Sequence, residues 1–205
     1  MRHIETARYM TTAFSGGVPP APRRHETPAE AQAVAAFWRD AGPARWFAKD
    51  DAFDRRFRER FLALHEAAAR GELEEWGRTS EGALALLILL DQFPRNAFRG
   101  TPRMYATDPL ARATAVAAVA AGHDLAAALE LRKFFYLPLA HSEDLADQAR
   151  SLALCSRADP IDAEHARGHY EIVRRFGRFP HRNPILGRVT TPDEQAYLDA
   201  GGYAG

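Results

Sequence analysis

A dense group of polar side chains directly follows the most apolar stretch of the chain. Residues 83–90 are all apolar, and the polar group after them consists of Asp91, Arg95, Asn96, Arg99 and Arg103. Guanidinium groups hold carboxylate and phosphate oxygens through paired hydrogen bonds. The group therefore predicts a pocket wall that binds an anion. The alternative is simple helix termination, in which arginines favour the helix dipole and Asp91 pairs with one of them.

A second group combines a histidine with carboxylates. His141 and Ser142 precede Glu143 and Asp144, and Asp147 follows one helical turn after Glu143. Histidine titrates near neutral pH, so His141 is a candidate acid or base that Glu143 or Asp144 would orient. A divalent cation is a second option for these acids. In the alternative interpretation, Ser142 caps a helix whose first turn carries dipole-favoured acids.

A third group lies in a loop that resembles the first. Phe93-Pro94-Arg95-Asn96 has a counterpart in Phe179-Pro180-His181-Arg182-Asn183, and Arg178 comes just before it. Each segment is expected to end a helix, bury its phenylalanine and present its Arg-Asn pair from a rigid corner. Five matched residues are also compatible with chance, and the second loop is compatible with a basic surface loop. His181 is the other candidate acid or base.

Two further residue types have simpler interpretations. His165 and His169 share a helix face and have the spacing of a metal-binding pair, but no third ligand lies nearby in the sequence, which favours solvated or packed histidines. Cys155 is the single cysteine and is expected to be a small core residue. No metal-binding, nucleotide-binding or nucleophile motif is present, so the sequence assigns no metal and no cofactor.

Helical patterns are expected to position these groups. Apolar spacings of three and four recur, alanine and leucine dominate, and no stretch alternates with a period of two. The pattern predicts an all-α fold of about eight short helices, in stacked pairs or a compact bundle. The run 83–90 predicts a buried helix. A short helix from Asp124 is expected to end near Phe134, and Pro138 disfavours helical geometry for Leu137. Residues 1–27, rich in glycine and proline, are expected to form a mobile arm before a single domain, 28–205.

Composition limits the partners. The 205 residues contain 27 basic and 27 acidic side chains, so the net charge is zero, whereas nucleic-acid binders usually show a basic excess. The longest apolar run is far too short to span a bilayer, and the first residues lack the apolar core of a signal peptide. With one cysteine, a disulfide within the chain is excluded, and the cytoplasm is the expected compartment. We therefore expect neither nucleic acid nor membrane as a partner.

Four blocks in order resemble the bacterial "domain of unknown function 924" family. They read FWRDAGPARWFAKDDAFD (37–54), LLDQFPRNAFRGTPRMYATDP (89–109), KFFYLPLAHSEDLADQ (133–148) and RFGRFPHRNPILGR (175–188). The resemblance covers about residues 30–200. It implies helices stacked in antiparallel pairs, in the manner of the tetratricopeptide-like superfamily, although the 34-residue repeat consensus is absent. It implies no established activity.

The polar positions that the resemblance carries over coincide with the groups above. They are Trp46, Lys49, Asp50, Asp54, Asp91, Gln92, Arg95, Asn96, Arg99, His141, Ser142, Glu143, Asp144, Arg178, His181, Arg182 and Asn183. The leading hypothesis is a pocket for a small anionic ligand, with the question of catalysis left open. A tetratricopeptide-like scaffold that binds a peptide or partner protein in a groove is the alternative. A third interpretation is an internal salt-bridge network without a ligand. The first predicts that residues 91–103, 141–144 and 178–183 meet in one place.

Overall fold

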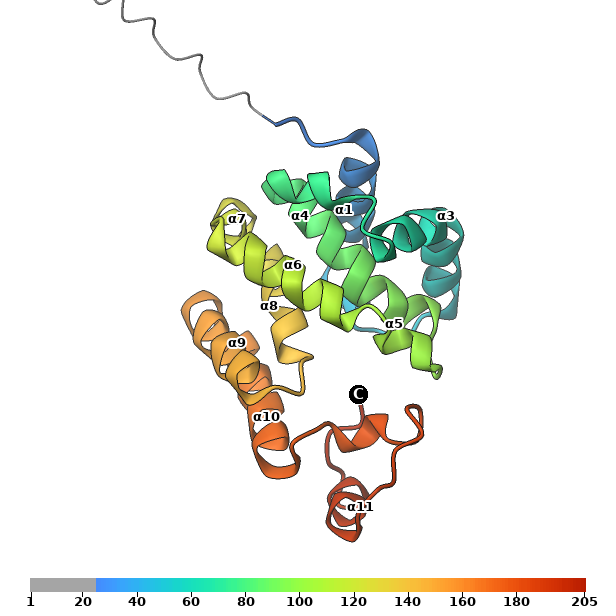
Figure 1. Cartoon of the computed structure of the whole chain (residues 1–205), viewed down its shortest axis with the longest axis vertical. Helices are drawn as coiled ribbons and strands as arrows, with labels where there is room; N and C mark the ends of the chain where they lie inside the picture. The colour runs from blue at the N-terminus through green and yellow to red at the C-terminus, as the bar shows by residue number, and fades with distance from the viewer. Residues whose placement is uncertain (1–24) are drawn as a thin grey trace, which may run out of the picture.

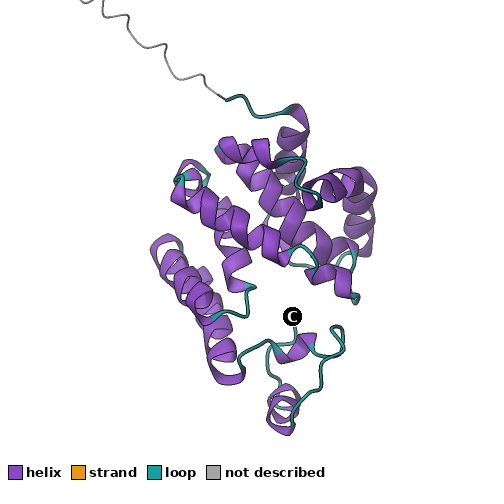
Figure 2. Ribbon diagram, in the orientation of Figure 1, coloured by secondary structure: helices purple, strands orange, loops and turns teal. Residues whose placement is uncertain are grey.

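The computed structural model describes residues 25–205, and this part of the chain is helical throughout, with no β-strand (Figures 1 and 2). The predicted mobile arm falls almost entirely on residues 1–24, which lie outside the described residues. At its end, the Thr27 hydroxyl lies 2.8 Å from that of Thr79. No helix between residues 25 and 205 has the length and apolar character needed to cross a membrane.

The all-α prediction is confirmed, and eight α-helices in the described part have eight residues or more. These are α1 (Ala29–Ala41), α3 (Asp51–Ala69), α4 (Ser80–Leu87), α6 (Asp108–Ala120), α8 (Lys133–Ala140), α9 (Leu145–Ala158), α10 (Pro160–Phe176) and α11 (Pro192–Asp199). Shorter α-helices are α2 (Pro43–Trp46), α5 (Phe93–Ala97) and α7 (His123–Ala126). The remaining turns are η1 (Glu74–Arg78), η2 (Ile88–Gln92), η3 (Pro102–Tyr105), η4 (Leu129–Leu131) and η5 (Pro180–Arg182).

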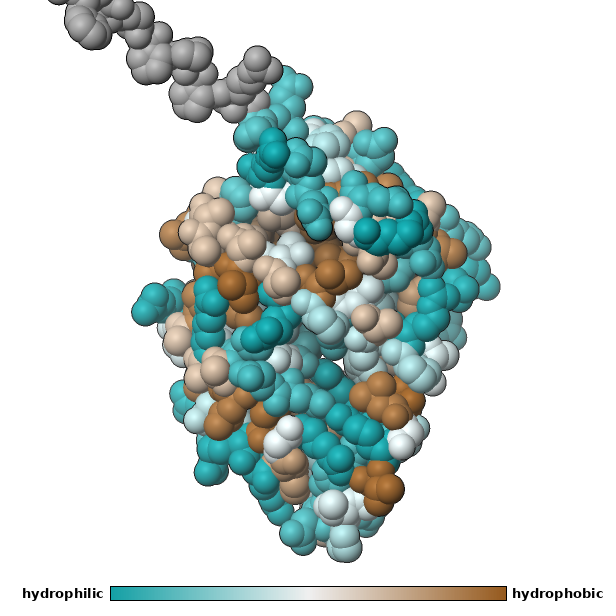
Figure 3. Space-filling model, in the orientation of Figure 1, coloured by the Kyte–Doolittle hydropathy of each residue, from teal (hydrophilic) through white to brown (hydrophobic). Residues whose placement is uncertain are grey.

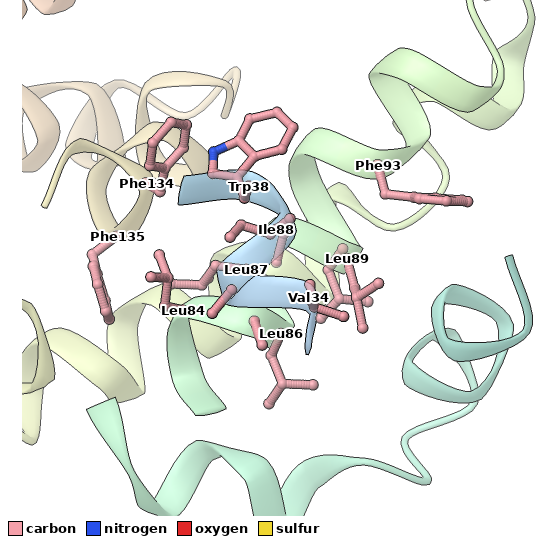
Figure 4. Close-up of a cluster of buried hydrophobic side chains, with 14 of the residues drawn as sticks. Val34, Trp38, Leu84, Leu86, Leu87, Ile88, Leu89, Phe93, Phe134 and Phe135 are labelled. Carbon is pink, nitrogen blue, oxygen red and sulfur yellow. The ribbon is translucent and has the colours of Figure 1, made fainter. Parts of the chain in front are cut away.

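The apolar run 83–90 lies at the centre of the core, as predicted. All eight of its side chains are buried. Figure 4 shows side chains from this run beside Val34 and Trp38 of α1 and Phe134 of α8. Full burial of a single leucine or isoleucine contributes roughly 1.5–3 kcal/mol. This run is therefore the main hydrophobic anchor for the polar residues that follow it.

The C-terminal part of the chain has a smaller hydrophobic cluster of its own. Ile172, Val173 and Phe179 are buried there, with Phe176 and Tyr197 packed against them. Residues after α10 turn back, so that the C-terminal residues lie between α5 and α11 (Figure 1). The space-filling view shows many hydrophilic residues on the lower half of the visible face, where α10 and α11 lie (Figure 3). This arrangement brings the end of the chain towards the polar group after residue 90.

The helix starts follow local capping chemistry, with one change from expectation. Thr191 and Glu194 form a capping box at the start of α11. The side chain of Asp144, rather than Ser142, accepts the hydrogen bonds at the start of α9. Ser142 instead donates to Asp147, at 2.7 Å. An N-terminal carboxylate is favoured by the helix dipole as well as by its hydrogen bonds.

The expected end of a helix near Phe134 and the non-helical geometry expected for Leu137 are wrong. Pro138 lies inside α8, which continues to Ala140. A proline removes one helical hydrogen bond and crowds the preceding turn. Here Phe134, Phe135 and Leu139 are buried on the same short helix. Tertiary packing thus outweighs the local preference, and the extra turn carries the chain to His141.

Candidate functional site

A π-helical turn delivers Asp91 to the site. The turn η2 interrupts the helical path between α4 and α5, and wide turns of this kind leave carbonyl groups without the usual partners. Side chains supply those partners: the Leu89 carbonyl lies 2.9 Å from Nδ1 of His65, and the Leu90 carbonyl accepts from Thr107 at 2.6 Å. These two contacts fix the conformation of the turn and thereby the position of Asp91.

Asp91 and His141 form a buried dyad. Nδ1 of His141 lies 2.8 Å from Oδ1 of Asp91, and Gln92 donates to the other carboxylate oxygen at 2.6 Å. Asp91 is only 1% exposed. The dyad joins the end of α8 to the π-helical turn. Residues 91–103 and 141–144, two of the three segments that were predicted to meet, are therefore in contact.

Electrostatics assign the protonation states of the dyad. Burial raises the pKa of Asp91, but the charges of Arg95 and His141 outweigh burial and hold that pKa below its ordinary value. Burial and then Arg95 lower the pKa of His141, against the opposing effect of Asp91. At neutral pH, Asp91 is therefore ionised and His141 neutral. Since a carboxylate only accepts hydrogen bonds, Nδ1 carries the proton and Nε2 keeps its lone pair.

Arg95 is fully committed to partners within the protein. It donates to both carboxylate oxygens of Asp108, at 2.8 and 3.0 Å, and to the backbone carbonyl of Asp91 at 2.7 Å. Its Nη1 also lies 3.2 Å from Oδ1 of Asp91. The guanidinium is thus fixed between two carboxylates. Its N–H donors are taken by these partners, so Arg95 contributes positive charge to the site but no free hydrogen-bond donors.

Arg182 differs from Arg95, because its donors are uncommitted. Its guanidinium carbon lies 4.6 Å from the centre of the Tyr105 ring and 4.5 Å from that of Phe179. Its nearest carboxylate in residues 25–205 is Asp108, at 3.6 Å, beyond hydrogen-bond distance. The residue is 6% exposed, and its Nε is buried without a hydrogen-bond partner there. Buried donors of this kind need an acceptor.

Two more histidines and a tyrosine surround the same place. The ring centre of His169 lies 6.3 Å from that of His141 and 4.8 Å from that of Tyr203, which in turn lies 5.1 Å from His181. Nδ1 of His169 and Nδ1 of His181 are buried without partners in the described chain. Burial and the nearby charge of His141 lower the pKa of His169 to about 3. Burial and the positive charge of Arg182 lower the pKa of His181 to about 4.

Glu143 holds the loop that carries His181 and Arg182. It accepts from the backbone N–H of Phe179 at 2.8 Å and from both terminal nitrogens of Arg188, at 2.7 and 3.0 Å. Burial raises the pKa of Glu143, but these hydrogen bonds outweigh it and leave that pKa lowered. Glu143 therefore positions the loop, whereas the sequence placed it beside a histidine as a catalytic group.

The two Phe-Pro corners share one arrangement. Both phenylalanines are fully buried, and each proline begins a helical turn, where the sequence analysis expected a helix to end. Arg95 and Arg182, at corresponding positions, both approach Asp108. The asparagine that follows each arginine binds a buried carboxylate behind the corner: Asn96 that of Asp54, and Asn183 that of Glu194.

Several predicted site residues therefore lie outside the cluster. Arg99 donates to Asp54 at 2.6 Å, together with Asn96, and ties α5 to α3. Arg178 binds Glu194 at 2.6 and 2.8 Å and holds α11 against its loop, as Asn183 does. Asp144 is an exposed helix cap. The partners of Arg99 and Arg178 come from other helices, which the motif pattern could not specify, whereas Asp144 only caps its own helix.

The cluster also contains residues that sequence reasoning missed as site members. These are Tyr105, Asp108, His169, Phe179 and Tyr203. Asp108 lies in the block 89–109 but outside the polar groups that the sequence singled out, and His169 was interpreted as half of a metal pair or as a packed residue. Tyr203 belongs to no motif. The aromatic character of the segments 103–109 and 175–188 was the available signal.

The assembled donors favour anionic oxygen over a metal ion. Within residues 25–205, no group of three or more His, Cys, Asp or Glu side chains is arranged to hold a metal. Arg182 carries N–H donors without a hydrogen-bond partner in residues 25–205, and Phe179, which packs against its guanidinium, also contacts the rings of His169 and His181. Nitrogen donors of this kind bind phosphate or carboxylate oxygens.

Known sequences and structures place the chain in a family. The sequence pattern described as "Bacterial protein of unknown function (DUF924)" matches residues 34–202. A protein of unknown function from Agrobacterium tumefaciens, ATU0120, has a similar solved structure, with a TM-score of 0.84 and 54% sequence identity. That match covers 86% of this chain and 100% of the other. A search of curated proteins gave no match. The chain therefore belongs to the DUF924 family of bacterial proteins.

Proposed function

We propose that this protein binds a small molecule bearing an oxyanion, such as a phosphate or carboxylate group, at Arg182. The observation that carries the proposal is a buried guanidinium that makes no hydrogen bond within residues 25–205. Removing a charged group from water without partners is costly. An anionic ligand would supply the missing acceptors, and the rings of Tyr105 and Phe179 would hold the guanidinium in place.

His141 gives this site the means for catalysis. Asp91 fixes the ring through Nδ1, so Nε2 points away from the carboxylate and is free to accept a proton. A histidine oriented by a buried carboxylate is the arrangement that general bases share across unrelated folds. The positive charge of Arg182 would stabilise negative charge that develops on the bound oxyanion. The role we propose for His141 is proton abstraction from a nucleophile beside that group.

Phosphate binding tests the proposal directly. At constant ionic strength, with chloride as the balancing anion, inorganic phosphate should raise the melting temperature of the protein, because it binds the native state. Arg182→Gln should abolish the rise. The matched control is Arg70→Gln, which removes an exposed arginine paired with Glu72. An equal rise in protein and Arg182→Gln variant would refute the anion site.

A tetratricopeptide-like scaffold remains the second proposal, and one groove supports it. A hollow of about 430 Å³ lies between α4 and α6 and is lined largely by small and aliphatic residues, among them Ala83, Leu86 and Leu110. The pairing of α9 with α10 is in keeping with stacked helix pairs (Figure 1). This proposal predicts that Leu110→Glu, at an exposed position that lines the groove, abolishes capture of a partner peptide, whereas Arg182→Gln does not. A peptide library displayed on phage would supply the probe.

A further inference from the structure

A second hollow adjoins the oxyanion site. It has a volume of about 660 Å³ and lies along α10, with Tyr197 of α11 and Tyr203 on its other side. Its apolar walls include Ile172 and Phe176. This volume is within the range of pockets that hold drug-sized molecules, which is roughly 300–1,000 Å³. Inorganic phosphate alone would leave it empty.

The hollow and the oxyanion site share two residues. His169 and Tyr203 both line the hollow. The His169 ring also packs edge-on against Phe179, at 5.4 Å between centres, and Phe179 stacks on Arg182. Two ring contacts therefore link the wall of the hollow to the uncommitted guanidinium. A ligand held at Arg182 is close enough to extend past His169 into the hollow.

The walls of the hollow favour a flat aromatic group over a flexible chain. Three aromatic rings face it, those of Phe176, Tyr197 and Tyr203. The guanidinium of Arg175 lies 4.6 Å from the ring centre of Phe176 and 5.8 Å from that of Tyr197, and it has no carboxylate partner in residues 25–205. Aromatic rings stack on one another and on guanidinium planes with favourable geometry.

We infer that the ligand of this site is an oxyanion joined to an aromatic body, with the anion at Arg182 and the ring in the hollow along α10. This inference rests on the proposed function and extends it to a substrate class. The phenol of Tyr203 makes no hydrogen bond within the described residues, and the residue is 41% exposed. Tyr203 is therefore the residue best placed to contact the ligand ring at the junction of the two parts.

Three probes separate the ligand parts: inorganic phosphate, phenyl phosphate and butyl phosphate. Their dissociation constants would be measured by isothermal titration calorimetry at pH 7 and constant ionic strength. We expect phenyl phosphate to bind at least about ten-fold more tightly than inorganic phosphate, with butyl phosphate weaker than phenyl phosphate. Arg182→Gln should abolish the binding of all three.

Substitution of Tyr203 tests the aromatic part alone. Tyr203→Ala should weaken phenyl phosphate about five- to ten-fold and leave inorganic phosphate within two-fold, whereas Tyr203→Phe should retain the tight binding. Tyr170→Ala is the matched control, since Tyr170 lies on α10 but does not line the hollow. Circular dichroism and melting temperature would verify that each variant is folded.

The outcomes distinguish the two proposals. If phenyl and inorganic phosphate bind equally, and Arg182→Gln abolishes both, the aromatic body is refuted while the oxyanion site stands. If phenyl phosphate binds tightly to the Arg182→Gln variant, the hollow acts without the guanidinium and the proposed link is refuted. If none of the three probes binds, both the oxyanion site and this inference are refuted.

Discussion

Nδ1 of His141 lies 2.8 Å from a carboxylate oxygen of Asp91, a residue 50 positions earlier in the chain. This contact joins the end of α8 to the π-helical turn after the core run. It also decides the chemistry of the ring, because the ionised carboxylate requires the proton on Nδ1. The unusual turn and the acid/base proposal therefore depend on the same pair of residues.

Asp91→Asn should separate the orienting role of the carboxylate from its structural role. The substitution removes the negative charge between Arg95 and His141, and it leaves only an amide oxygen as a weaker acceptor for the His141 Nδ1–H group. Loss of one partner from a buried ion pair costs about 3 kcal/mol. We expect a decrease of that size in the free energy of unfolding, measured by urea denaturation, and loss of the slowly exchanging His141 Nδ1–H signal in nuclear magnetic resonance spectra.

Glu75→Gln is the control for Asp91→Asn, because it breaks an exposed pair with Arg78. Exposed pairs contribute between zero and about 1 kcal/mol. A decrease in unfolding free energy no larger for Asp91→Asn than for Glu75→Gln would contradict the buried dyad.

Arg182→Leu should stabilise the protein and remove anion binding. The guanidinium is buried without hydrogen bonds in the described chain, so the native state carries its desolvation cost. Leucine would fill the space between Tyr105 and Phe179, and Asp108 would keep its paired contact with Arg95. We expect the free energy of unfolding to rise by about 1 kcal/mol in the absence of ligand. Residues needed for function often lower stability, so their replacement by an apolar residue can stabilise a protein. A clear loss of stability would show that Arg182 has a structural role.

Acid should destabilise the protein from about pH 6.5 downwards. The folded-state pKa values of His169 and His181, about 3 and about 4, lie below the ordinary value of 6.5. Below pH 6.5, the unfolded chain binds protons that the folded chain does not, so unfolding becomes easier as the pH falls. Each histidine adds a slope of at most about 1.4 kcal/mol per pH unit, which ends near its folded pKa.

Urea denaturation between pH 4 and pH 8 would measure this dependence. His169→Gln should make the curve flatter below pH 6.5, and His165→Gln, at an exposed position on the same helix, should leave it unchanged. Equal slopes for the protein and the His169→Gln variant would show that His169 takes up its proton in the folded state.

The sequence was sufficient for the helical class and for the location of the core. Residues 83–90 are apolar on every side, and only a central position can bury such a helix. Polar residues directly after this run had to lie near the core, which is why the three segments could be predicted to meet. The capping box of Thr191 and Glu194 is also encoded locally, by a threonine followed three residues later by a glutamate.

The partners of individual residues could not be predicted. Arg95, Arg99 and Arg182 look alike in sequence, yet the first two have carboxylate hydrogen-bond partners and the third has none in the described chain. That difference depends on Asp54 and Asp108, which tertiary packing brings into place. The π-helical turn was also missed, because its cause is a set of remote side-chain contacts and not a local motif.

Thr107→Val tests whether those remote contacts hold the turn. The hydroxyl of Thr107 donates to the Leu90 carbonyl at 2.6 Å, inside the protein. Valine has a similar shape but leaves this carbonyl without its partner, which costs about 1–3 kcal/mol. We expect that loss in urea denaturation, together with weaker phosphate binding if the turn also positions the dyad. Unchanged stability would show that the π-helical turn does not depend on Thr107.

Asp54, Asn96 and Arg99 should behave as one structural unit without influence on the ligand. Asn96 and Arg99 both donate to the Asp54 carboxylate, which is 9% exposed. Hydrogen bonds to charged groups contribute about 1.5–3 kcal/mol, so Arg99→Ala should lower the unfolding free energy by about that amount. In a variant that already lacks the Asp54 carboxylate (Asp54→Asn), the same change should cost much less, because residues in one network are coupled. Phosphate affinity should remain within two-fold in all three variants. A large loss of phosphate affinity in the Arg99→Ala variant would instead show that Arg99 belongs to the binding site, as the sequence pattern predicted.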